Sequence, residues 1–63
     1  MPIIQVNLLE GRTTDQKRKL VAAVTDAVVK SLDAKPESVR IILHEMSKQD
    51  YAIGGVLSLD NKS

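Results

Sequence analysis

The stretch IIQVNLL, residues 3–9, decides the fold of this chain, because it is β-branched, aliphatic and soon followed by a helical pattern. Ile4, Val6 and Leu8 alternate with residues of mixed polarity, and such alternation is typical of a half-buried strand. Glu10-Gly11-Arg12 then interrupts the pattern. We therefore predict a strand over residues 3–9 that has one clean apolar face and one mixed face.

A long helix is predicted next, from about Thr14 to Leu32. Thr13 and Gln16 have the spacing of a capping box, in which each side chain satisfies a backbone N–H of the other residue. Pro36 ends the helix region, because the residue before a proline disfavours helical geometry. The basic run of residues 17–19 is expected on the solvent-exposed side. Apolar side chains recur at helical spacing, at Leu20, Val21, Val24, Ala27, Val28 and Leu32.

A second strand is predicted from Val39 to Met46. A strand, a helix of this length and another strand form a β-α-β unit, whose strands run parallel with a right-handed crossover. After a polar loop at 47–50, Gly54-Gly55 indicates a short hairpin with strands at 51–53 and 56–59, and residues 60–63 are expected to fray. The predicted fold class is thus α+β, in one domain covering residues 1–63.

The two faces of this sheet predict association with further copies. One helix can cover one face, and we expect it on the clean one, formed by Ile4, Val6, Leu8, Val39, Ile41 and Leu43. The opposite face still carries apolar side chains, at Ile3, Leu9, Ile42 and Met46. An exposed apolar patch of this kind typically marks an interface.

Size and composition support the same conclusion. A domain of 63 residues with one aromatic residue needs disulfides, a metal or oligomerisation to offset its conformational entropy. The chain has no Cys, and His44 is its only His, so disulfides are excluded and a structural metal site is not expected. A homo-oligomer is therefore the default prediction.

Charge and hydropathy exclude several partners. Nine basic and eight acidic residues give a net charge of +1, whereas non-specific nucleic-acid binding needs a strongly basic domain. No apolar run approaches the ~20 residues of a membrane span, and the first residues lack the pattern of a signal peptide. We expect a soluble cytoplasmic protein without nucleic-acid or membrane partners.

Pro2 is the residue best suited to carry out chemistry. No Ser/His/Asp triad, metal-ligand grouping or phosphate loop is present. If Met1 is removed, the nitrogen of Pro2 becomes a free secondary amine. An α-amino group titrates near pH ~7.7–8.0, and nearby cations or a low-dielectric pocket would lower its pKa. Such an amine suits general acid–base catalysis near neutral pH.

The whole chain resembles the 4-oxalocrotonate tautomerase family of the tautomerase superfamily, from Pro2 to about Leu57. The resemblance depends on four motifs taken in order, none of which is specific alone. They are Met1-Pro2 before an apolar strand, LEGRT at 9–13, SVRII at 38–42 followed by Glu45-Met46, and YAIGG at 51–55.

The resemblance implies a tautomerase that uses neither cofactor nor metal. Pro2 would act as general base and then general acid, converting a 2-hydroxydienoate such as 2-hydroxymuconate to the conjugated 2-oxo acid. Arg12 would bind one substrate carboxylate and draw electron density along the conjugated chain. Arg40 would bind the other carboxylate and the 2-oxygen, with help from the backbone around Leu9. Tyr51 matches an aromatic residue of the family's site.

The resemblance also implies a hexamer, built as a trimer of dimers, with sites assembled from more than one subunit. Strand alternation agrees, because it places Pro2 in phase with Ile4 and Arg40 on the opposite face. We therefore expect Arg40 and Tyr51 of one chain to meet Pro2 of another. Degradation of aromatic compounds is the pathway that the resemblance suggests, and a biosynthetic role is equally compatible.

Several alternatives stay open at this point. The best-known family members carry Phe where this chain has Tyr51, so the substrate preference is undecided. Hydration or dehalogenation ranks lower, since Ile53 is apolar and Asp50 is the only acid nearby. A promiscuous enol–keto tautomerase, a family member acting on another enol acid, and a non-catalytic oligomeric binding module are the remaining candidates.

Overall fold

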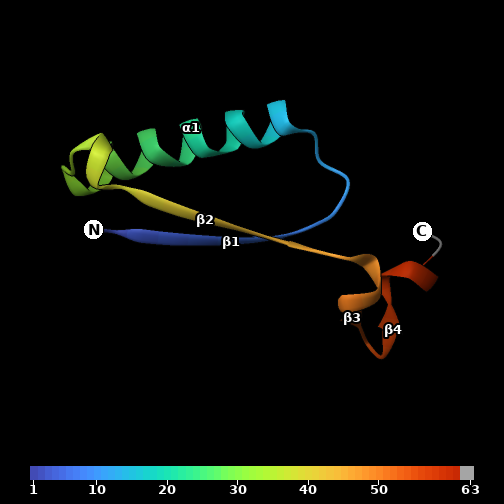
Figure 1. The fold of residues 1–63 in the computed structure, drawn as a ribbon. Coiled ribbons are helices and arrows are strands. Elements are labelled where there is room, and N and C mark those ends of the chain that lie inside the picture. The colour runs from blue at the N-terminus through green and yellow to red at the C-terminus, as the bar shows by residue number, and fades with distance from the viewer. Residues whose placement is uncertain (62–63) are drawn as a thin grey trace.

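The computed structural model describes residues 1–61 and has the predicted β-α-β order with a hairpin at its C-terminal end (Figure 1). The first strand and the helix have the predicted bounds. The elements are β1 (Ile3–Leu9), α1 (Thr14–Leu32), the 3-10 turn η1 (Pro36–Ser38), β2 (Arg40–Met46), the turn η2 (Lys48–Asp50), β3 (Ala52–Ile53), β4 (Val56–Leu57) and the turn η3 (Ser58–Asp60).

The predicted boundaries need correction in three segments. β2 begins at Arg40 rather than Val39, because Val39 is the residue that closes η1 through its N–H to the carbonyl of Pro36. The hairpin strands are shorter than predicted, and residues 58–59 belong to η3, in which the N–H of Asn61 bonds to the carbonyl of Ser58. Asp60 lies in η3 instead of a frayed tail, while residues 62–63 fall outside the described part of the chain.

The start of α1 is fixed by the predicted capping box. The N–H of Gln16 donates to Oγ1 of Thr13 over 3.1 Å, and the N–H of Thr13 donates to Oε1 of Gln16 over 2.9 Å. These bonds satisfy two backbone donors that an α-helix otherwise leaves open at its beginning. At the other end Asp33 is left-handed, with φ of 55°, a conformation that Asp tolerates better than most side chains.

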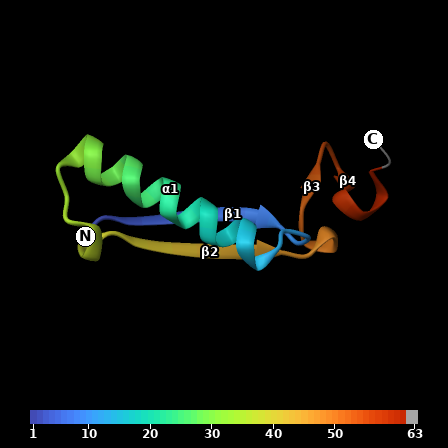
Figure 2. The ribbon, with the colours of Figure 1, turned by 90° about the horizontal axis from the view of Figure 1, so that it is seen from above.

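β1 and β2 form a parallel two-stranded sheet. Its register runs from Ile3 opposite Arg40 to Leu9 opposite Met46. One further hydrogen bond extends the ladder at each end, from the N–H of Arg40 to the carbonyl of Pro2 (3.0 Å) and from the N–H of Glu10 to the carbonyl of Met46 (2.8 Å). α1 lies across one face of this sheet, and the separate β3–β4 hairpin stands beyond the strands' carboxyl ends (Figure 2).

Residues 1–61 of the protomer form no closed core. The side chains beneath α1 are only half-buried, and no residue among 1–61 is buried. On the open face, Ile3 and Ile42 are 49% and 51% exposed, whereas Leu9 and Met46 are half-buried. The hairpin exposes further apolar side chains, at Ile53, Val56, Leu57 and Leu59.

The accessible surface and the radius of gyration also show that the protomer is not compact. Its accessible surface is 5006 Å², against about 4000 Å² for a folded monomer of this mass. Its radius of gyration is 14.7 Å, against about 11 Å for a compact domain of this length. No helix within residues 1–61 combines the length and the apolarity that crossing a membrane requires.

We predict that Thr13→Ala lowers the free energy of unfolding by about 1 kcal/mol, because it removes the N-cap oxygen that accepts from Gln16. Thr14→Ala is the matched control, since Thr14 lies inside the helix and its loss should change stability by less than about 0.5 kcal/mol. Urea denaturation at one fixed protein concentration measures both. Equal stabilities for the two variants would contradict the role of the cap.

Candidate active site

The expected site residues lie at the two ends of the β1–β2 sheet. Pro2 precedes β1 and Leu9 ends it. Since a strand rises about 3.3 Å per residue, Pro2 and Leu9 are about 23 Å apart. Arg40 starts β2 beside Pro2, whereas Arg12 and Tyr51 lie in the loops at the far end. One protomer therefore separates the predicted site into two halves.

The first half contains Pro2 and Arg40. The backbone N–H of Arg40 bonds to the carbonyl of Pro2, so the two main chains are neighbours. Their side chains point to opposite faces, because Arg40 pairs with Ile3, which is exposed on the open face, while Pro2 is half-buried in phase with Ile4. Nη1 of Arg40 donates to the carbonyl of Ser38 over 3.2 Å. Alternation thus separates the ring of Pro2 from the guanidinium, as the sequence predicts.

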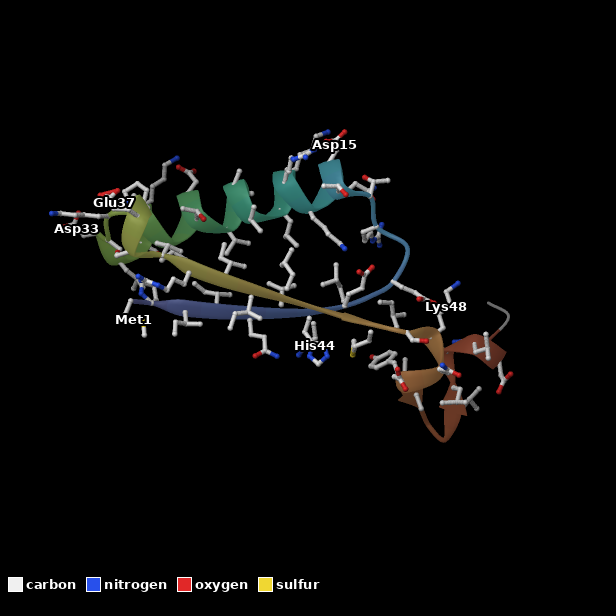
Figure 3. All side chains as sticks on the ribbon, viewed as in Figure 1. Met1, Asp15, Asp33, Glu37, His44 and Lys48 are labelled. Carbon is white, nitrogen blue, oxygen red and sulfur yellow. The ribbon has the colours of Figure 1, made fainter. Side chains whose placement is uncertain are left out.

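Access to the Pro2 nitrogen depends on the preceding residue. Met1 is 75% exposed, so this residue is largely open to solvent. Figure 3 shows Met1 at the end of the sheet remote from Lys48. With Met1 attached, the Pro2 nitrogen is an amide without a proton and without useful basicity.

The second half is an open hollow of about 610 Å³, which we call the distal hollow. Its floor is the end of β1 and β2, and its walls are the β1–α1 loop and the segment around η2. Gly11, with φ of 118°, lets the loop turn beside it. The lining residues are Asn7, Leu8, Leu9, Glu10, Gly11, Arg12, Met46, Lys48 and Tyr51.

Short local bonds hold the η2 wall in place. Oγ of Ser47 accepts from the N–H of Gln49 over 3.3 Å and caps the turn that carries Lys48. The carbonyl of Tyr51 accepts from the N–H of Ser58 over 2.8 Å, which ties the Tyr51 backbone to the end of the hairpin. The Tyr51 side chain stays 40% exposed.

The distal hollow is rich in positive charge. Among residues 1–61, Arg12 and Lys48 line it together with one carboxylate, that of Glu10. The ion pairs found within residues 1–61 involve other side chains: Lys17–Glu45, Arg18–Asp15 and Lys30–Asp26. Both cations of the hollow are therefore open to an anionic ligand. An arginine can grip a carboxylate through two parallel hydrogen bonds.

Two features of this region were not predicted from the sequence: the place of Lys48 and the ion pair of Lys17. Lys48 was indistinguishable from any lysine of a polar loop. Lys17 was predicted on the solvent-exposed side, and that prediction was wrong: its Nζ lies 2.9 Å from Oε1 of Glu45, and its side chain is only 28% exposed. The spacing of Lys17 with Leu20 and Val24 could have placed it on the apolar stripe of the helix.

Within residues 1–61, the side chains that could bind a metal ion do not cluster. His44 points away from α1 on the open face, where it is exposed (Figure 3). Across residues 1–61, no group of three or more His, Cys, Asp or Glu side chains is placed to hold a metal ion.

Comparison with known proteins gives the family. A family model described as tautomerase enzyme matches residues 2–61. A probable tautomerase of Listeria monocytogenes is 50% identical over 60 residues, covering 95% of this chain and 98% of that protein. A 2-hydroxymuconate tautomerase of Pseudomonas putida is 48% identical over 58 residues, with 92% of each chain covered. This chain belongs to the tautomerase family.

Solved structures agree with this assignment. A 4-oxalocrotonate tautomerase isozyme from Methylibium petroleiphilum superposes with a TM-score of 0.90 at 50% identity, covering 92% of this chain and 91% of that one. A heterohexamer 4-oxalocrotonate tautomerase from Chloroflexus aurantiacus superposes with a TM-score of 0.92 at 29% identity, covering 98% and 100%. The predicted fold class and the predicted family are both confirmed.

We predict that Lys17 and Glu45 couple the start of α1 to β2. In a double-mutant cycle of Lys17→Met and Glu45→Gln, the coupling free energy should be about 0.5–1 kcal/mol, because the pair is only partly exposed. The same cycle on Lys30 and Asp26, an exposed pair within α1, should give about 0.3 kcal/mol. A Lys17–Glu45 coupling no larger than that control would contradict the prediction.

Proposed function

We propose that this protein is a cofactor-free tautomerase that converts a 2-hydroxydienoate, such as 2-hydroxymuconate, to the conjugated 2-oxo acid. Membership of the tautomerase family and 48% identity to a 2-hydroxymuconate tautomerase support this activity and this substrate. The observation that carries the proposal is the cationic distal hollow, where Arg12 lies ready to bind a carboxylate. A cytoplasmic role in the breakdown of aromatic compounds fits such a substrate.

The chemistry assigned to Pro2 is a proton shuttle. The free amine accepts the proton of the 2-hydroxyl group, and the electron pair moves along the diene towards the far carboxylate. The resulting ammonium then returns a proton to a carbon of the chain, which completes the ketone without net gain or loss of protons. Cations at the carboxylates stabilise the negative charge that develops between the two transfers, and they favour the neutral amine.

The separation of the two halves makes association part of this proposal. A six-carbon substrate is far shorter than the ~23 Å between Pro2 and Leu9 in one protomer. A second copy must therefore bring its Pro2 to the distal hollow of the first. A two-fold contact forms two such sites, because Pro2 of each chain then lies at the distal hollow of the other chain.

The open face of the sheet is the surface that we assign to this contact. It exposes Ile3 and Ile42. The surface of the whole chain exceeds that of a compact monomer by about 1000 Å², which is more than the roughly 800 Å² that each partner buries in a standard interface. A homohexamer built from three such dimers is the proposed assembly, and the heterohexamer from Chloroflexus aurantiacus supports it. Arg40, on the same face as Ile42, would then reach a site of a neighbouring chain.

We predict that Pro2→Ala leaves the assembly intact and lowers kcat for 2-hydroxymuconate by about 100-fold. Alanine keeps an amine after loss of Met1 but lacks the ring that fixes its direction, and a general base contributes about 10²–10⁴-fold. Ultraviolet absorbance follows the conversion, and intact mass confirms that Met1 is absent from both proteins. Full activity in Pro2→Ala, or in protein that retains Met1, would exclude Pro2 as the proton carrier.

We predict that Ile42→Lys dissociates the assembly and abolishes activity together with it. A charge placed in the centre of the open face cannot be buried in an interface without an opposite charge to pair with it. Sedimentation velocity and the absorbance assay are run on the same samples. Ala23→Lys, on the exposed side of α1, is the control and should change neither. An active monomeric Ile42→Lys variant would contradict a site shared between chains.

A non-catalytic binding module is the outcome that these experiments would otherwise support. Such a module would assemble normally and bind acids in the distal hollow. It would convert neither 2-hydroxymuconate nor another enol acid, whether or not Pro2 carries a free amine.

A further inference from the structure

Lys48 is the cation of the distal hollow to which the proposed reaction gives no role. It is the first residue of η2 and follows the capping residue Ser47. Figure 3 shows Lys48 at the end of the molecule opposite Met1, beside the β1–α1 loop. Its position is set by the cap and the turn rather than by an ion pair, since none of the pairs found within residues 1–61 includes it.

Among residues 1–61, the distal hollow carries more positive than negative charge. Arg12 and Lys48 contribute two positive charges, and Glu10 contributes one negative charge. The remaining lining is largely apolar, from Leu8, Leu9 and Met46. Apolar walls lower the local dielectric constant, which strengthens the attraction between a fixed cation and a bound anion.

We propose that Lys48 binds the substrate carboxylate remote from the enol together with Arg12, and that it makes the enzyme selective for dicarboxylates. This inference rests on the proposed tautomerase function. The two cations act differently: the planar guanidinium of Arg12 fixes the orientation of the carboxylate, while the flexible ammonium of Lys48 adds a compact charge to the lining of the hollow. A substrate with a carboxylate only beside the enol gains nothing from Lys48.

The kinetic test compares two substrates that share the reacting enol. 2-Hydroxymuconate carries a carboxylate at each end, whereas 2-hydroxy-2,4-pentadienoate carries only the carboxylate beside the hydroxyl group. Lys48→Met keeps the aliphatic stem and removes the charge. We expect it to lower kcat/KM for 2-hydroxymuconate about tenfold, mainly through KM, because a ground-state contact to the remote carboxylate is lost. For the monocarboxylate the change should stay within about twofold.

Two further variants isolate the effect of the charge at this position. Lys48→Arg should retain kcat/KM for the dicarboxylate within about threefold, because it keeps a cation in the lining of the hollow. Lys19→Met removes the same charge from the exposed side of α1 and should change neither substrate. Equal losses on both substrates in Lys48→Met, or no loss on either, would overturn the proposed selectivity.

A binding measurement separates failure of this inference from failure of the proposed function. Muconate and sorbate are six-carbon dienes without the hydroxyl group, with two carboxylates and one, so neither can be tautomerised as an enol. In calorimetric titrations, Lys48→Met should weaken muconate binding about tenfold and leave sorbate binding unchanged. If the unaltered protein converts no enol acid but shows this pattern, the proposed reaction is wrong and Lys48 keeps its role. If the unaltered protein binds muconate no better than sorbate, the role of Lys48 is wrong.

Discussion

The protein depends on one constraint: a single helix can cover only one face of a two-stranded sheet. α1 packs on the face formed by the inward side chains of β1 and β2, and even there the residues are only half-buried. Within residues 1–61, no helix or strand covers the opposite face, where Ile3 and Ile42 are about half exposed. The surface of the chain exceeds that of a compact monomer by about 1000 Å², and this open face contributes to the excess. Such a protomer lacks the buried area that would offset its conformational entropy.

The same constraint shapes the chemistry. β1 is a straight, seven-residue spacer with Pro2 at its start and the distal hollow at its end. A compact domain could fold these ends together, but a fully extended strand cannot. The base and the carboxylate-binding cations of the proposed reaction therefore meet only if a second chain lies against the first. The exposed apolar face that destabilises the protomer is the surface that we propose for this contact.

The charges of the distal hollow come from two segments that the fold brings together. Arg12 follows β1, and Lys48 follows β2. Because the strands are parallel, their carboxyl ends lie at the same edge of the sheet, and the loops that follow them face each other. Among residues 1–61, Glu10 is the one carboxylate that lines the distal hollow with these two cations. The proposed selectivity for dicarboxylates follows from this arrangement of two loops.

Prediction from the sequence succeeded where the signal was local. The alternation in residues 3–9 gave β1, the Thr13–Gln16 spacing gave the start of α1, and Gly54-Gly55 gave the position of the hairpin. It failed where neighbouring turns compete with strand propensity, as at residues 58–59, which form η3. Of the expected site residues, Leu9, Arg12 and Tyr51 converge in the protomer, but Pro2 and Arg40 do not join them.

The sequence by itself determined the order and type of the elements, the family, and the apolar composition of both sheet faces, because periodicity, capping and motifs are properties of neighbouring residues. Only the tertiary structure decided which loops share a hollow, that Lys48 belongs to it, and that Lys17 pairs with Glu45. These are contacts between segments far apart along the chain. Their partners are set by how α1 and the loops pack against the sheet, which no local pattern encodes.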